Sequence, residues 1–293
     1  MTRAVRYLLP LLAGLALSAC GVLTKMAYSN VAFAYNQFPP MLTWMIDGYV
    51  DMSGEQKEWM RDRVARIMEW HRSHELPEYR RFLERVLVET SEPYTVPEVA
   101  QAYAELRKHY RAAVEQVLPD AADFLLRLDA AQVAQMEEKF ADDNRKFVKE
   151  SLKGTPDQRR ERRVKQFVGH LDGWLGSVTD AQRDIVEGYY ADIPDLVEER
   201  LADRKVRHSE TLALVRSKPT REQMIAGLRK LMVDSDSWRR PEYLKKLADR
   251  DKRFFELLSK VSATLSPGQR SHLQERIRGY MKDLGKLSAE RAG

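Results

Sequence analysis

The segment from Trp70 to Tyr79, WHRSHELPEY, holds the residue types most able to do chemistry, because it combines two imidazoles with two carboxylates. A zinc protease of the H-E-x-x-H type needs both histidines one turn apart on an unbroken helix. Here the residue four positions after His74 is Glu78, and the inverted H-x-x-E-H order is also absent. Pro77 predicts that the helix ends before it, since proline lacks an N–H and disfavours α geometry at the preceding residue. The protease motif is therefore excluded.

His71 and His74 extend the apolar positions of the preceding segment, so we expect both to face inward at a helix end. The favoured interpretation is a structural cluster, in which the histidines bond to free helix carbonyls or to the next helix start and Arg72 pairs with Glu75. The alternative is a metal site, for which the sequence marks no third ligand. We predict no catalytic residue, metal ion or cofactor. The candidate cluster consists of Trp70, His71, Arg72, His74, Glu75, Pro77 and Tyr79.

Helical periodicity runs through almost the whole chain. Apolar residues recur every three or four positions over residues 96–117, 164–175, 244–265 and 273–287, as expected for amphipathic helices that need partner helices. Five segments also place a capping residue three positions before a glutamine, the pattern of a capping box at a helix start. They begin at Ser53, Asp129, Thr179, Thr220 and Ser266. The sequence predicts an all-α, elongated bundle of roughly ten helices.

Two parts of the chain resemble each other. Trp70 followed by Pro77-Glu78-Tyr79 is echoed by Trp238 followed by Pro241-Glu242-Tyr243. Each Pro-Glu-Tyr is typical of a helix start, so a duplicated helical hairpin is one interpretation and chance the other. The best candidate for a boundary between lobes is 153–156.

The N-terminus is typical of a secreted bacterial lipoprotein. A short basic start is followed by an apolar run from Tyr7 to Ala16 and then by Leu17-Ser18-Ala19-Cys20. The run is about half the length of the ~20 apolar residues that a membrane-spanning helix needs. We predict a signal peptide at 1–19, acylation of Cys20, an aromatic-rich set of first helices at 20–50 and a helical domain at 51–293. An ordinary signal peptide with a chance cysteine is the alternative. Gly21, in place of an aspartate, favours the periplasmic face of the outer membrane.

The charge and the cysteine content limit the kinds of bond and partner that we expect for this protein. Cys20 is the only cysteine, which leaves no thiol for a disulfide. The net charge of +5 is modest, and basic residues alternate with acidic ones, so we expect no nucleic-acid partner. A basic patch that could meet anionic headgroups, or simply be a solvated face, consists of Arg159, Arg160, Arg162, Arg163 and Lys165.

With these residues in view, the chain resembles a family of proteobacterial lipoproteins known as domain of unknown function 6279. The resemblance rests on Cys20, Ala34-Tyr35-Asn36, Trp44 and Tyr49 ahead of Ser53-x-x-Gln56, and the segment from Trp70 to Tyr79. It implies an all-helical lipoprotein and brings no activity with it. The caps at Thr179 and Ser266 are more weakly similar to the Leu-Thr-x-x-Gln motif of helical periplasmic stress chaperones.

We therefore expect a non-enzymatic envelope protein that binds another envelope component or unfolded clients, and is held on the membrane by its lipid. The alternatives are a metal-dependent envelope hydrolase using the 70–79 cluster, and a binder of lipopolysaccharide or peptidoglycan.

Overall fold

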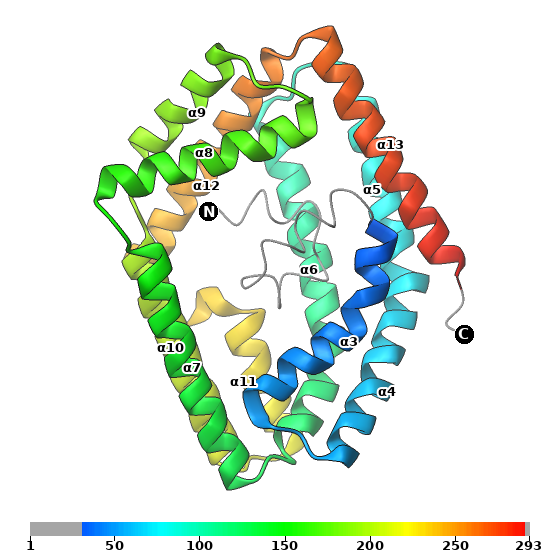
Figure 1. Cartoon of the computed structure of the whole chain (residues 1–293), viewed down its shortest axis with the longest axis vertical. Coiled ribbons are helices and arrows are strands. Elements are labelled where there is room, and N and C mark those ends of the chain that lie inside the picture. Colours follow the sequence, from blue (N-terminus) through cyan, green and yellow to red (C-terminus); the bar gives the residue numbers. More distant parts are fainter. Residues whose placement is uncertain (1–30, 291–293) are drawn as a thin grey trace.

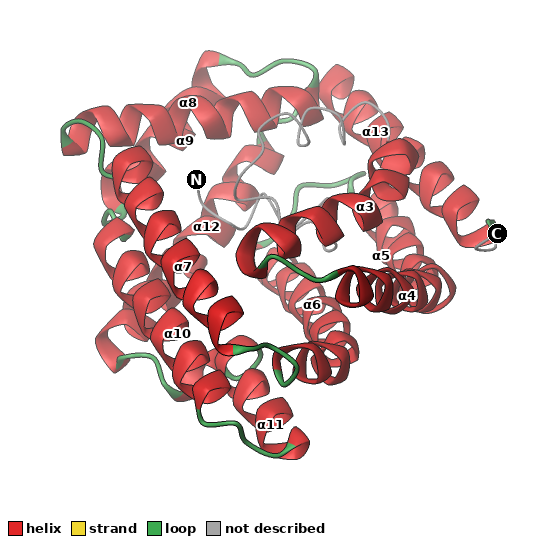
Figure 2. Ribbon diagram, turned by 60° about the horizontal axis from the view of Figure 1, so that its bottom comes forward, coloured by secondary structure: helices red, strands yellow, loops and turns green. Residues whose placement is uncertain are grey.

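The computed structural model describes residues 31–290, and within that range every regular element is a helix (Figure 2). The prediction of an all-α bundle is confirmed. The elements are α3 (Val31–Val50), α4 (Gly54–Trp70), η1 (His71–Glu75), α5 (Leu76–Glu89), α6 (Val96–Leu125), α7 (Ala130–Ser151), α8 (Pro156–Leu175), α9 (Asp180–Asp192), α10 (Val197–Arg216), α11 (Arg221–Met232), η2 (Ser235–Ser237), α12 (Pro241–Ala263) and α13 (Pro267–Ala289).

Capping boxes start most of these helices. All five predicted boxes are present: each capping side chain accepts from the backbone N–H three residues on, and the glutamine there accepts from the cap's own N–H. Thr95 with Glu98 and Thr155 with Gln158 form two further boxes that sequence reasoning missed. Each box satisfies two donors that a helix start otherwise leaves unpaired.

The helices pack in a closed ring (Figure 1). Contacts pass from α3 to α7, then to α10, α11, α6, α12, α9, α8 and α13, and α13 returns to α3. α4 lies against α3, and α5 lies against α13. The first and last described helices are therefore direct neighbours.

Three apolar cores stabilise the described part of the ring. The first joins α3, α4, α6, α7, α10 and α11 with the end of α13, the second joins α8, α9 and α12, and the third joins α5 to α13. The predicted boundary at 153–156 falls on the connection between α7 and α8. The cores do not divide the chain there into two halves, because α10 and α11 return to the first core.

Residues 31–50 form one helix, α3, although Pro39 and Pro40 lie inside it. Prolines remove two helical hydrogen bonds. The carbonyls that lose a donor are those of Tyr35 and Asn36, whereas Thr43 donates its hydroxyl to the carbonyl of Pro39 over 3.1 Å. The expected first helices at 20–50 are thus a single helix in their described part.

The two segments predicted as repeats differ in structure. α4, η1 and α5 form one uninterrupted helical run, whereas α11 and α12 are separated by η2 and flanking turns. The residues after Met232 include Asp234, Ser235, Asp236 and Ser237, types that favour turns. The first segment is therefore not a hairpin, and the duplicated hairpin is not found.

None of the helices within residues 31–290 is both long and apolar enough to cross a bilayer.

Candidate functional site

The segment from Trp70 to Tyr79 contains a π-helical turn. The N–H of Leu76 donates to the carbonyl of His71, five residues back, and Leu76 has φ −61° and ψ −37°. The prediction that Pro77 ends the helix is therefore wrong. In an α-helix the ring of Pro77 would meet the carbonyl of Ser73. The wider π-turn does not require a hydrogen bond from residue 77 to the carbonyl of Ser73, so the helix continues into α5.

The same turn decides which side chains face the core. A π-turn takes more residues per turn, so the residue four positions on, and not three, returns to the same face. His71 and Glu75 are accordingly buried, with 1% and 7% of their surfaces exposed. His74 is exposed, contrary to the prediction that both histidines face inward. It stacks on Trp70 with 5.9 Å between ring centroids, and its Nδ1 lies 3.1 Å from the Trp70 carbonyl.

The buried side chains meet partners from α3 and α6. Nδ1 of His71 lies 3.1 Å from the hydroxyl of Tyr35. Nδ1 of His109, on α6, lies 3.2 Å from Oε2 of Glu75. The ring of Tyr79 fills the space between the two histidines, with centroid distances of 5.4 Å to His71 and 5.0 Å to His109. We call these five residues the π-turn cluster.

Burial controls the protonation of this cluster. It lowers the pKa of His71 to about 4, against the opposing effect of the Glu75 charge. His71 is therefore neutral at pH 7, and one of its nitrogens is an acceptor. Burial, reinforced by the Glu75 charge, raises the pKa of Tyr79. A carboxylate can only accept, so Nδ1 of His109 is the donor to Glu75.

The predicted pairing of Arg72 with Glu75 does not form. Arg72 instead donates to Oδ1 of Asn36 over 2.7 Å, and its guanidinium lies 5.4 Å from the centre of the Tyr35 ring. Both partners belong to α3. Arg72 and His71 thus fasten the π-turn to α3, while Glu75 fastens it to α6.

The polar atoms of the cluster lie under the surface. Some of them pair within it, as His71 does with Tyr35 and His109 with Glu75, whereas Nε2 of both histidines and the hydroxyl of Tyr79 are buried without a hydrogen-bond partner. Within residues 31–290, no group of three or more His, Cys, Asp or Glu side chains is placed to hold a metal ion.

A family model described as "Family of unknown function (DUF6279)" matches residues 48–244. The chain belongs to this family. Neither the curated proteins nor the solved structures give a match. The matched DUF6279 region contains η1, α6 and most of the π-turn cluster, whereas most of α3 and all of α13 lie outside it.

Sequence reasoning missed two members of the π-turn cluster. His109 lies three residues after Leu106 and so shares its side of α6, which is the local signal for burial. The sequence singles out Tyr35 only as part of Ala34-Tyr35-Asn36, one of the segments on which the resemblance to the DUF6279 family rests. Neither position indicates by itself which histidine or carboxylate it contacts.

The predicted basic patch is divided by ion pairs. Arg159 and Arg163 both reach Asp195, at 2.7 and 2.8 Å, and are largely buried. Burial raises the pKa of Asp195, but the Arg159 hydrogen bond and the Arg163 charge outweigh it and lower that pKa. Arg160, Arg162 and Lys165 remain exposed, Arg160 beside Asp157 at 3.0 Å.

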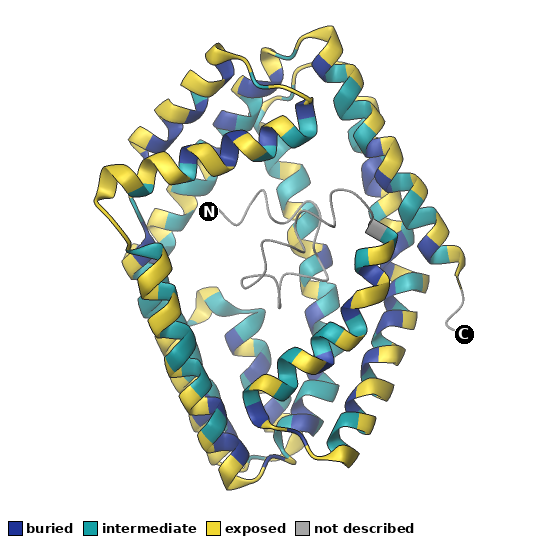
Figure 3. Cartoon of the chain, viewed as in Figure 1, coloured by how far each residue is buried: buried dark blue, intermediate teal, exposed yellow. Residues whose placement is uncertain are grey.

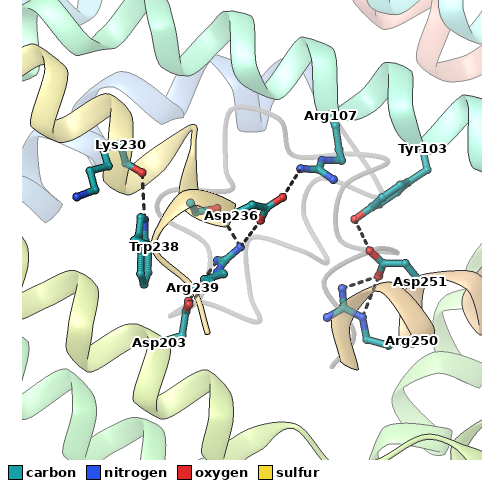
Figure 4. A network of polar contacts seen from close by, with 10 residues as sticks. Tyr103, Arg107, Asp203, Lys230, Asp236, Trp238, Arg239, Arg250 and Asp251 are labelled. Carbon is teal, nitrogen blue, oxygen red and sulfur yellow. Dashed lines mark hydrogen bonds and ion pairs between the residues drawn. The ribbon is translucent and has the colours of Figure 1, made fainter. Parts of the chain in front are cut away.

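A second polar network joins α6, α10, η2 and α12 (Figure 4). Arg239 pairs with Asp203 at 2.7 Å and with Asp236 at 3.4 Å, and Arg107 approaches Asp236 at 3.8 Å. The indole of Trp238 donates to the Lys230 carbonyl over 3.0 Å. The network thus holds the turn between α11 and α12 against α10.

A surface cleft of about 340 Å³ opens where α4 and α7 begin. Gln56 and Gln132 from two capping boxes line it, together with Trp59 and Arg127. Arg127 lies 4.7 Å from the centre of the Trp59 ring, so these two lining residues bind each other. The predicted signal peptide at 1–19 and Cys20 lie outside the described residues.

Proposed function

We propose that this protein is a lipid-anchored, non-enzymatic interaction protein of the bacterial cell envelope, on the periplasmic face of the outer membrane. The burial of the π-turn cluster is the observation that carries the non-enzymatic part. His71, Glu75 and His109 are the residues most able to do acid–base chemistry, and they are 1%, 7% and 8% exposed. A substrate would have to displace α3 or α6 to reach them.

The anchor is supported by the sequence Leu17-Ser18-Ala19-Cys20 after an apolar run. Acyl chains contribute about 0.8 kcal/mol per buried methylene, so two or three chains on one cysteine hold a protein at a bilayer. Metabolic labelling with an alkyne analogue of palmitate tests this proposal. We expect label on the wild type, none on Cys20→Ser, and wild-type protein in the outer-membrane fraction. Unlabelled wild-type protein would refute the anchor.

The enzyme alternative has its own test. Replacement of His71 by alanine should lower thermal stability without changing bound metal, because the side chain is a buried partner of Tyr35. Elemental analysis of the purified wild type, with His74→Ala as the exposed control, provides the measurement. Stoichiometric metal that disappears in His71→Ala would support a metal-dependent hydrolase and overturn the proposal.

The mode of interaction is testable in the same preparation. The exposed large apolar residues of the described chain are spread over α3, α5, α7 and α10, and consist of Phe33, Trp44, Val88, Val148 and Val206. These residues do not form one broad apolar surface of the kind that would bind unfolded clients. Their distribution favours contact with a partner through a smaller, defined surface. We expect purified protein to leave aggregation of a reduced model substrate unchanged. Suppression at equimolar protein would instead support the chaperone-like form.

A further inference from the structure

The exposed positions of α3, yellow in Figure 3, carry no charged side chain. They consist of Phe33, Asn36, Gln37, Pro40, Trp44 and Gly48. Helical spacing places them on one face, and Asn36, at the edge of that face, accepts a hydrogen bond from Arg72. The charged residue of α3, Asp47, pairs with Lys57 at 3.1 Å. In a chain with 32% charged residues, an exposed helical face without a charge is unusual.

Trp44 is the most exposed large apolar residue of this face, with 73% of its surface exposed. Each of the chain's other tryptophans makes a ring contact or an indole hydrogen bond within the protein. Trp59 stacks on Phe124, Trp70 on His74, and Trp238 donates to the Lys230 carbonyl, while Trp174 contacts Tyr280.

We propose that this face of α3 lies on the lipid bilayer, with Trp44 at the level of the headgroups. The inference rests on the proposed acylation of Cys20. Residues 21–30 join Cys20 to α3, and an extended chain of that length reaches at most roughly 40 Å. The tether therefore keeps α3 close to the membrane that holds the acyl chains, and raises the effective concentration of even a weak contact.

The chemistry of the face fits this occupant. Tryptophan prefers the membrane interface, because its apolar ring can contact the acyl chains there while its N–H finds a polar partner among the headgroups. Gln37 can keep its hydrogen bonds among headgroups, and no charge has to be desolvated. A bilayer thus covers the apolar area without a complementary protein surface.

The test uses the acylated full-length protein in vesicles of phosphatidylethanolamine and phosphatidylglycerol. Acylation blocks the thiol of Cys20, so Gln37→Cys supplies the free thiol for an environment-sensitive fluorophore. Ser209→Cys, exposed on α10, is the matched control. We expect a blue shift and quenching by headgroup-level nitroxide lipids at position 37, little of either at position 209, and loss of both effects when Trp44→Ser is added.

Equal, water-like spectra at both positions on acylated, vesicle-bound protein would overturn the inference while leaving the anchor intact. A blue shift at position 37 in unacylated Cys20→Ser protein without vesicles or detergent would also overturn it, since a second copy of the chain would then cover the face. Failure of the palmitate label removes the proposed anchor itself, and this inference with it.

Discussion

Gln182 and Gln269 each donate a side-chain N–H to the other's side-chain oxygen, over 3.0 and 2.8 Å. Both are capping-box glutamines, so each oxygen also accepts from the backbone N–H of its own cap. Gln56 and Gln132 form the same reciprocal pair between α4 and α7. Helix starts far apart in the sequence are thereby joined through their caps.

Removing one glutamine of such a pair should destabilise the protein more than removing a capping-box glutamine that does not bond to a second glutamine. Gln182→Ala leaves buried donors and acceptors unsatisfied, which costs about 1–3 kcal/mol of unfolding free energy. Gln223→Ala, at an exposed box, should cost about 1 kcal/mol or less. Urea denaturation measures both. In a double-mutant cycle with Gln269→Ala the costs should be non-additive, and strict additivity would contradict the pairing.

Stability should fall as the pH is lowered from about 6.5 towards 4. The pKa of His71 is about 4 in the folded state, below its ordinary value of 6.5, so the unfolded chain binds a proton in this window that the folded chain does not. Each such group contributes a slope of about 1.4 kcal/mol per pH unit. His208, whose pKa burial also lowers to about 4, adds to it.

Urea midpoints between pH 4.5 and 7 measure this dependence. His71→Gln should have a shallower slope than the wild type, and His74→Gln, at the exposed histidine of the same segment, is the matched control. An unchanged slope in His71→Gln would show that His71 is not the buried neutral group inferred from the structure.

Replacing Asp195 should loosen the contact between α8 and the segment that joins α9 to α10. Its carboxylate faces both Arg159 and Arg163, and Asp195→Asn leaves two partly buried guanidinium groups without a counter-charge. We expect a loss of about 1–3 kcal/mol. Asp157→Asn removes an exposed partner of Arg160, which should cost less than about 1 kcal/mol. Thermal unfolding distinguishes the two, and equal effects would contradict the role of Asp195.

The packing of α13 should be essential although it lies outside the matched DUF6279 region. Leu287 is 0% exposed and belongs to the core that includes α3. Leu287→Ala should cost about 2–5 kcal/mol, whereas Val88→Ala, at a site 73% exposed, should change stability by about 0.5 kcal/mol or less. A neutral Leu287→Ala in urea denaturation would mean that α13 is not part of the core.

Much of the fold could be predicted because its signals are local. The capping boxes at Ser53, Asp129 and Thr179 are set by residues three positions apart, and apolar spacing marks the buried side of a helix. Thr95 was missed because its box ends in glutamate, and Thr155 because its segment was interpreted as a boundary loop.

The candidate site could not be predicted to the same depth. Its residue types were visible, but which of them point inward depends on the π-turn. That turn combines the missing N–H of Pro77 with contacts to Tyr35 and His109, and these lie 36 and 34 residues from His71 and Glu75. Only the packing of three helices selects those partners.

The contact of α13 with α3 has a consequence for how the molecule matures. α3 finds one of its neighbours in α13, which follows it only after all the other described helices. A nascent or truncated chain that lacks α13 must leave part of α3 uncovered. The packing of α3 is therefore completed late, by a helix far from it in the sequence.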